Sequence, residues 1–274
     1  MRAATASTAE IFAANRAIGR VGLTVRAREA ATRRERVVED GSLRVRFPGS
    51  AARELDAVIV NTAGGIAGGD RFEIDLEVGE GAALALTSAS AEKVYRSLGP
   101  DATIGVRLAV GAGASLAWLP QETILFDSAR LARNIDVAID ETAGLLLAEA
   151  VVFGRSQMGE QVEAGHFFDR WRIRRGARLV YAETVRLDGA IAQKFARPAV
   201  ARGGCAVATI LRVPGNDAQV AAVRALAFAG EVGISAWNGI CVTRLCARDG
   251  AALRRDLVQV LSVLRGGALP RLWS

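Results

Sequence analysis

The sequence has few residues of the kinds that usually carry disulfide, metal or nucleophilic chemistry. It contains three cysteines, Cys205, Cys241 and Cys246, and no Cys-x-x-Cys pair. An odd number of thiols without that spacing predicts neither a disulfide framework nor a zinc site, so we interpret them as buried or idle. His166 is the one histidine. A catalytic triad or zinc site built on several histidines is therefore excluded, and we expect His166 to be structural.

Aromatic residues and long hydrophobic runs are also scarce. Only 5% of the 274 residues are aromatic, which leaves few platforms for stacking on nucleic acid, and the arginines behind the net charge of +6 are spread along the chain. We expect no nucleic-acid binding, and an acidic protein surface suits this diffuse charge better. No run approaches the ~20 apolar residues of a membrane span. Residues 1–20 lack the apolar core of a secretory signal, so we expect a loose N-terminal segment of a cytoplasmic protein.

What the chain has instead is a repeat. Four segments share a turn followed by an apolar strand, and they align on Gly81, Gly113, Ala143 and Gly176 at steps of 32, 30 and 33 residues. Each turn follows a strand that alternates with period two, as in "FEIDLEV" at residues 72–78. The pattern predicts stacked β-hairpin units in residues 21–200, arranged either as a β-helix-like stack or as a sandwich.

Residues 201–274 predict a small α/β part that packs on this body, so that the chain forms one domain overall. One helix is expected from a capping Asp217 to Gly230, and a second precedes Gly266 with leucine and valine on one face. Between the helices, the dipeptide Asn238-Gly239 predicts a β-hairpin. The expected fold class is therefore mainly β, with two helices near the C-terminus.

The stretch "NTAGGIAGGDRF", residues 61–72, is rich in glycine, but it does not match a nucleotide site. A P-loop needs lysine where Asp70 stands, and a dinucleotide loop opens a helix, whereas this one leads into an alternating strand. We interpret it as a tight connection between two strands or a partner surface. The residues concerned are Gly64, Gly65, Gly68, Gly69 and Asp70.

Carboxylates within or just after the apolar strands are the remaining candidates for chemistry. Glu149, Glu183 and Glu122 lie in "LLLAEAVVFGR", "LVYAETVRLDG" and "LPQETILFD". An enclosed acid is costly unless it is paired, so a structural salt bridge with an arginine is one interpretation. The other is a polar path, where hard oxygen ligands hold a divalent ion weakly and pass it on.

Four motifs together identify a family resemblance. "NTAGGIAGGDRF", "SASAEKVYRS", "LPQETILFDSARL" and the ending "LPRLWS" occur in this order from residue 61 to the C-terminus. Together they resemble the urease accessory protein UreD family, also called UreH, over most of the chain.

The resemblance implies a non-enzymatic scaffold with a mainly β, stacked fold. Such a protein binds apo-urease and, with UreF and the GTPase UreG, helps to insert nickel into the urease active site. It has no permanent cofactor, and nickel passes through an internal channel. Glu149, Glu183 and Glu122 are then the candidate residues of the nickel path. The alternative from a different class is a β-helical carbohydrate-active enzyme that uses two carboxylates as acid and base.

Overall fold

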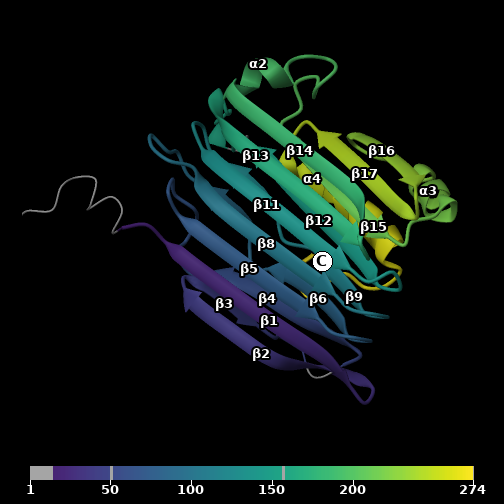
Figure 1. Cartoon of the computed structure of the whole chain (residues 1–274). Helices are drawn as coiled ribbons and strands as arrows, with labels where there is room; N and C mark the ends of the chain where they lie inside the picture. The colour runs from purple at the N-terminus through teal and green to yellow at the C-terminus, as the bar shows by residue number, and fades with distance from the viewer. Residues whose placement is uncertain (1–14, 50–51, 156–157, 274) are drawn as a thin grey trace, which may run out of the picture.

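Two β-sheets lie face to face and form the body of the protein, as the computed structural model shows (Figure 1). The structure describes residues 15–49, 52–155 and 158–273. The first sheet, called sheet A, has the strand order β14-β13-β11-β8-β5-β1-β2. Its strands are β1 (Ile18–Arg28), β2 (Ala31–Gly41), β5 (Arg71–Val78), β8 (Ala102–Val110), β11 (Arg130–Ile139), β13 (Ala164–Arg175) and β14 (Arg178–Ala190).

The second sheet, called sheet B, has the order β16-β17-β15-β12-β9-β6-β4-β3. Its strands are β3 (Leu43–Arg46), β4 (Glu54–Asn61), β6 (Ala83–Ser88), β9 (Ser115–Trp118), β12 (Gly144–Phe153), β15 (Ala206–Val213), β16 (Glu231–Trp237) and β17 (Ile240–Ala247). Two short strands, β7 (Glu92–Val94) and β10 (Thr123–Leu125), pair with each other, and β10 also pairs with β12. Apolar side chains from both sheets meet in one core between them.

The predicted stacked repeat is confirmed. Each of the first three repeats supplies one strand to sheet A and one to sheet B, and successive repeats pair in parallel, β5 with β8, β8 with β11 and β6 with β9. Alternation places Phe72, Ile74, Leu76 and Val78 of β5 in the core, as predicted. The arrangement is therefore the β-helix-like one.

The hairpin assigned to each repeat was wrong for three of the four units. Residues 79–82, 111–114 and 140–143 connect a strand of sheet A to a strand of the opposite sheet, and the two strands do not pair with each other. Among these four units, only the last, made of β13 and β14, forms an antiparallel hairpin, and it is joined by two residues, 176–177. In these four units, the two-residue turn returns the chain to its own sheet, and the four-residue turns carry it to the other sheet.

The C-terminal part extends sheet B and covers its outer face. Strand β15 pairs antiparallel with β12, and β17 and then β16 continue sheet B beyond it as further antiparallel strands. The predicted hairpin at Asn238-Gly239 joins β16 and β17. Helix α4 (Gly250–Arg265) packs on this sheet through buried leucine and valine side chains, and Gly266 ends it with φ of 66°. Short helical segments complete the chain, α2 (Ile191–Phe195) and η2 (Arg271–Trp273).

The other predicted helix is shorter than expected. Helix α3 (Asp217–Arg224) begins after Asn216, whose side chain accepts a bond from the Gln219 backbone in a capping box, so Asp217 is not the cap. The helix ends at Arg224, and beyond it the backbone N–H groups of Ala229 and Gly230 bind the buried Asp256 carboxylate of α4.

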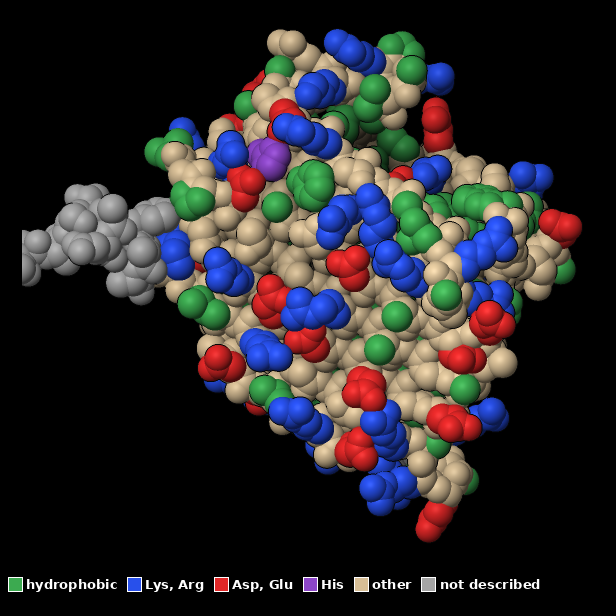
Figure 2. Space-filling model, in the orientation of Figure 1, with side chains coloured by type: hydrophobic (Ala, Val, Ile, Leu, Met, Phe, Trp, Pro, Cys, Tyr) green, Lys and Arg blue, Asp and Glu red, His purple; other side chains and the backbone are tan. Residues whose placement is uncertain are grey.

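The outer face of sheet A is polar, with basic and acidic side chains interleaved (Figure 2). Arg107, for example, lies between Glu73 and Asp75 at 2.9 and 2.5 Å. The predicted loose segment, residues 1–20, falls mostly outside the described residues, and its described end enters β1 at Ile18. In the described ranges, none of the helices has both the length and the apolar character needed to cross a membrane.

Candidate functional site

Three charged side chains from three strands meet in the core between the two sheets. Arg133 of β11 and Asp169 of β13 stand in register on adjacent parallel strands of sheet A. Glu149 of β12 faces them from sheet B. All three are buried, with exposed fractions of 3% for Arg133, 5% for Glu149 and 6% for Asp169. We call these three residues the buried ionic cluster.

Arg133 holds both carboxylates of the cluster. Its Nε donates to Asp169 Oδ1 at 3.0 Å, its Nη2 donates to Asp169 Oδ2 at 2.6 Å, and its Nη1 donates to Glu149 Oε2. Each carboxylate also accepts a bond from an indole N–H. Trp118 donates to Glu149 Oε1 at 2.8 Å, and Trp171 donates to Asp169 Oδ2 at 3.1 Å. The guanidinium is thus bidentate on Asp169 and makes one bond to Glu149.

The two carboxylates of the cluster outnumber its single guanidinium, so the cluster attracts further positive charge. When all three groups are ionised, two carboxylates face one guanidinium, and a single negative charge is left in excess. Burial raises the pKa of Glu149 above its ordinary value, since desolvation outweighs the opposing effect of Arg133, and the charge of Asp169 raises it further. The pKa of Arg133 is raised by the two carboxylates despite its burial, so the guanidinium stays charged.

Two hollows lie between the sheets on either side of this cluster, and Arg133 and Glu149 line both of them. The large hollow has a volume of about 540 Å³, and its walls include Phe153, Phe167, Trp171, Phe195, Glu183 and Arg244. The small hollow has a volume of about 70 Å³, and its walls include Asn61, Phe72, Ile104, Trp118, Glu92 and Gln121. The Arg133–Glu149 pair is therefore their common wall.

Glu183 and Arg244 form the polar part of the large hollow near the edge strands β14 and β16. Glu183 Oε1 accepts a bond from Arg244 Nη2 at 2.6 Å, and its Oε2 accepts one from the Tyr181 hydroxyl at 2.5 Å. Burial and the neighbouring carboxylate raise the pKa of Tyr181. The structure thus brings two of the three predicted glutamates, Glu149 and Glu183, to the walls of one hollow.

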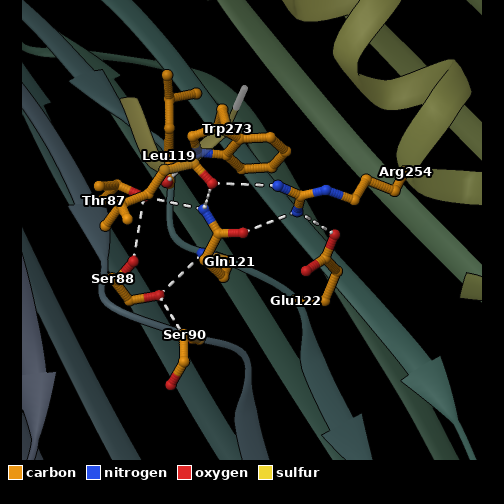
Figure 3. A network of polar contacts seen from close by, with 9 residues as sticks. Thr87, Ser88, Ser90, Leu119, Gln121, Glu122, Arg254 and Trp273 are labelled. Carbon is orange, nitrogen blue, oxygen red and sulfur yellow. Dashed lines mark hydrogen bonds and ion pairs between the residues drawn. The ribbon is translucent and has the colours of Figure 1, made fainter. Parts of the chain in front are cut away.

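The third predicted glutamate lies elsewhere. Glu122 faces α4, where Arg254 Nη1 donates to its Oε1 at 2.9 Å (Figure 3). The same guanidinium binds the Gln121 side chain and the Leu272 carbonyl, and it lies over the ring of the buried Trp273. We call this set the C-terminal network, because it fastens the end of the chain to the segment after β9.

A carboxylate beside this network does face the interior. Glu92 of β7 lines the small hollow, where Asn61 Nδ2 donates to its Oε2 at 3.1 Å. Burial raises the pKa of Glu92. The small hollow therefore has a titratable group at its polar end.

The glycine-rich loop between β4 and β5 is a structural connection. Asp70 is buried and accepts bonds from the backbone N–H groups of Ala17 and Ala67 at 2.8 and 2.7 Å, so it fixes the turn. Gly65 has φ of 144°, and a Cβ there would come within 2.4 Å of Tyr95. A Cβ at Gly68 would come within 1.9 Å of Ser97 Oγ. The loop therefore packs directly on the "SASAEKVYRS" segment, and Gly64 and Gly69 also have positive φ.

Sequence reasoning missed Arg133, Asp169 and the two tryptophans that orient the carboxylates. A usable signal was present. Arg133 stands between Leu131 and Ile135 on the inward side of an alternating strand, and Asp169 stands between Phe167 and Trp171. In the described part of the chain, no group of three or more His, Cys, Asp or Glu side chains is arranged to hold a metal ion.

Comparison with known proteins connects this architecture to one family. The family model described as "UreD urease accessory protein" matches residues 17–274. The urease accessory protein UreD of Rhodopseudomonas palustris (strain BisB18) is 60% identical, with 97% of each chain covered. The urease accessory protein UreD of Bradyrhizobium diazoefficiens is 57% identical over 100% of this chain and 99% of its own. This chain therefore belongs to the UreD family of urease accessory proteins.

Proposed function

We propose that this protein is a non-catalytic scaffold in urease maturation and that nickel passes through its interior. In this proposal it binds apo-urease and works with UreF and the GTPase UreG, while nickel is cargo and no cofactor stays bound. The family supports a role in urease maturation. The partners, the passage of nickel and a cytoplasmic location remain predictions.

The observation that carries the nickel path is the position of the carboxylates between the sheets. Glu183, Asp169 and Glu149 line the large hollow, and Glu92 lines the small hollow beyond the Arg133–Glu149 wall. Carboxylate oxygens are hard ligands and bind nickel less tightly than imidazole or thiolate does. A row of such groups suits successive weak binding and release. Glu122 is left out of the proposed path because it points toward α4.

The carbohydrate-active alternative has less support. A pair of glycosidase carboxylates must reach a sugar from two sides, and one of them must carry a proton for the leaving group. Glu149 and Asp169 are both bound to Arg133, and both are at least nine-tenths buried. This arrangement occupies the oxygens that would have to meet a polysaccharide chain.

Substitutions that remove charge and keep shape test the path. Glu149→Gln and Glu183→Gln would be co-expressed with urease and the other accessory proteins, and urease activity and nickel per urease active site would be measured. Glu80→Gln is the matched control, because Glu80 is exposed in the turn between β5 and β6. We expect both interior variants to co-purify with urease but to yield less nickel-loaded enzyme. If each carboxylate contributes about 1.4 kcal/mol to passage, the nickel content of urease should fall about tenfold.

The two parts of the proposal fail in different ways. Normal nickel content with both interior variants would refute the path. A wild-type chain that does not co-purify with urease would refute the scaffold role. Glu122→Gln belongs in the same series, and we expect its nickel content to equal that of the Glu80 control.

A further inference from the structure

Arg133 presents a problem for any cation that moves between the two hollows. Its guanidinium lies in their common wall and is bonded to Glu149, which lines both hollows, and to Asp169, which lines the large one. Because like charges repel strongly in a poorly solvated interior, a divalent ion cannot share this position with the guanidinium. Either the route ends here or Arg133 moves.

Each of the two carboxylates is also held by a hydrogen bond that does not involve Arg133. Glu149 is held by the indole N–H of Trp118, and Asp169 is held by that of Trp171. Both tryptophans are buried, with 3% and 2% of their surface exposed. Trp118 lies on β9, next to the strand β12 that carries Glu149. Trp171 lies on β13, the same strand as Asp169. The oxygens that now bind the guanidinium would therefore stay near one common point after its removal.

We propose that Arg133 is a displaceable internal counterion, which closes the interior when no metal is present and yields Glu149 and Asp169 to a divalent cation in transit. This inference rests on the proposed nickel path. The cation replaces one positive charge with two at the same pair of carboxylates. When all three groups are ionised, the cluster has one negative charge in excess, and a divalent ion is attracted to it before Arg133 leaves.

The contacts indicate an order of events. Arg133 makes one bond to Glu149 and two to Asp169, so the Glu149 contact breaks first and Arg133 stays attached to Asp169. The large hollow beside it, of about 540 Å³, has room for the displaced guanidinium. Once the ion has passed, the same charges draw Arg133 back, and the wall closes again.

Removal of the guanidinium provides a direct test with nickel alone. In full-length Arg133→Met, the two oriented carboxylates lack their counterion, and we expect Ni²⁺ affinity in equilibrium dialysis to rise at least about tenfold over the wild type. The double variant Arg133→Met/Glu149→Gln should lose this gain. Arg107→Met is the matched control, because Arg107 also lies between two carboxylates, Glu73 and Asp75, but on the exposed outer face. Nickel affinity equal to that of the wild type in folded Arg133→Met would overturn the proposal.

A second variant keeps the test decisive if Arg133→Met does not fold. Arg133→Lys retains the charge but loses the bidentate hold on Asp169, so its nickel affinity should rise by a smaller factor, about threefold or more. No increase in Arg133→Lys would also overturn the proposal. Failure of the nickel path shows separately, as normal nickel content of urease with both Glu149→Gln and Glu183→Gln, whatever the nickel affinity of Arg133→Met. If Arg133→Met bound nickel more tightly and yet loaded urease normally, the site beside Arg133 would lie outside the route, and the proposed role of Arg133 in transit would be refuted.

Discussion

The C-terminal network provides the most sharply defined stability prediction. Trp273 is 2% exposed, its Nε1 donates to the Leu119 carbonyl at 2.9 Å, and Arg254 lies 5.0 Å from its ring (Figure 3). Trp273→Ala removes a buried aromatic side chain, which costs about 3–5 kcal/mol in protein cores. Trp273→Phe keeps most of the apolar surface but leaves the buried Leu119 carbonyl without its donor, at a cost of about 1–3 kcal/mol.

Urea denaturation followed by far-UV circular dichroism would measure these losses in free energy of unfolding. Leu272→Ala is the control, because that side chain is 42% exposed and only its backbone carbonyl takes part in the network. We expect it to change stability by about 0.5 kcal/mol or less. If Trp273→Ala were as stable as Leu272→Ala, the end of the chain would not be fastened as described, and the reasoning would fail.

Two further predictions concern the glycine-rich loop and the small hollow. In the same urea assay, Gly68→Ala should lower the free energy of unfolding by about 1–3 kcal/mol, since the added Cβ would lie 1.9 Å from Ser97 Oγ. Gly233→Ala, where no atom lies within 4 Å of the added Cβ, should be nearly neutral. Burial raises the pKa of Glu92, because the buried carboxyl prefers to stay protonated. The protonated form therefore contributes to stability at low pH, and this contribution is lost as the pH rises through the folded-state pKa. The stability of Glu92→Gln relative to the wild type should therefore increase from about pH 4 to about pH 8, and a difference that is constant with pH would contradict this.

Much of the fold was accessible from the sequence because alternation and repeat spacing are local properties. Period-two patterning identified the sheet A strands β5, β8, β11 and β13, and the spacing of about 30 residues revealed the stack. The pairing of strands was not accessible from these patterns alone, since an alternating strand has the same sequence whether its successor lies beside it or in the opposite sheet. The length of each turn carried that information, with four residues for a crossing and two, at 176–177, for the hairpin.

The interior site was predictable only in part. Glu149 was identified because it interrupts an apolar strand, and an acid in such a position must find a partner. Its partner Arg133 is 16 residues away and in the other sheet, so it becomes a neighbour only after the chain has crossed between sheets. Glu122 was grouped with Glu149 by position in the repeat, but it lies in the connection between β9 and β10, where its side chain points toward α4 and Arg254. Side-chain direction in such a connection depends on how the helix and the sheet pack, which one sequence does not show.

The register of the strands in sheet A has a consequence for the length of the interior. Phe72, Ile104, Arg133, Asp169 and Val185 occupy matching positions on five adjacent strands, and the two hollows follow this row across the sheet. Adjacent strands lie about 4.8 Å apart, so the row spans about 19 Å, and each strand contributes one residue to it. Insertion or deletion of one repeat would therefore lengthen or shorten the interior by one strand spacing, while a substitution at one row position changes its chemistry at a single depth. Length and local chemistry can thus vary independently in this fold.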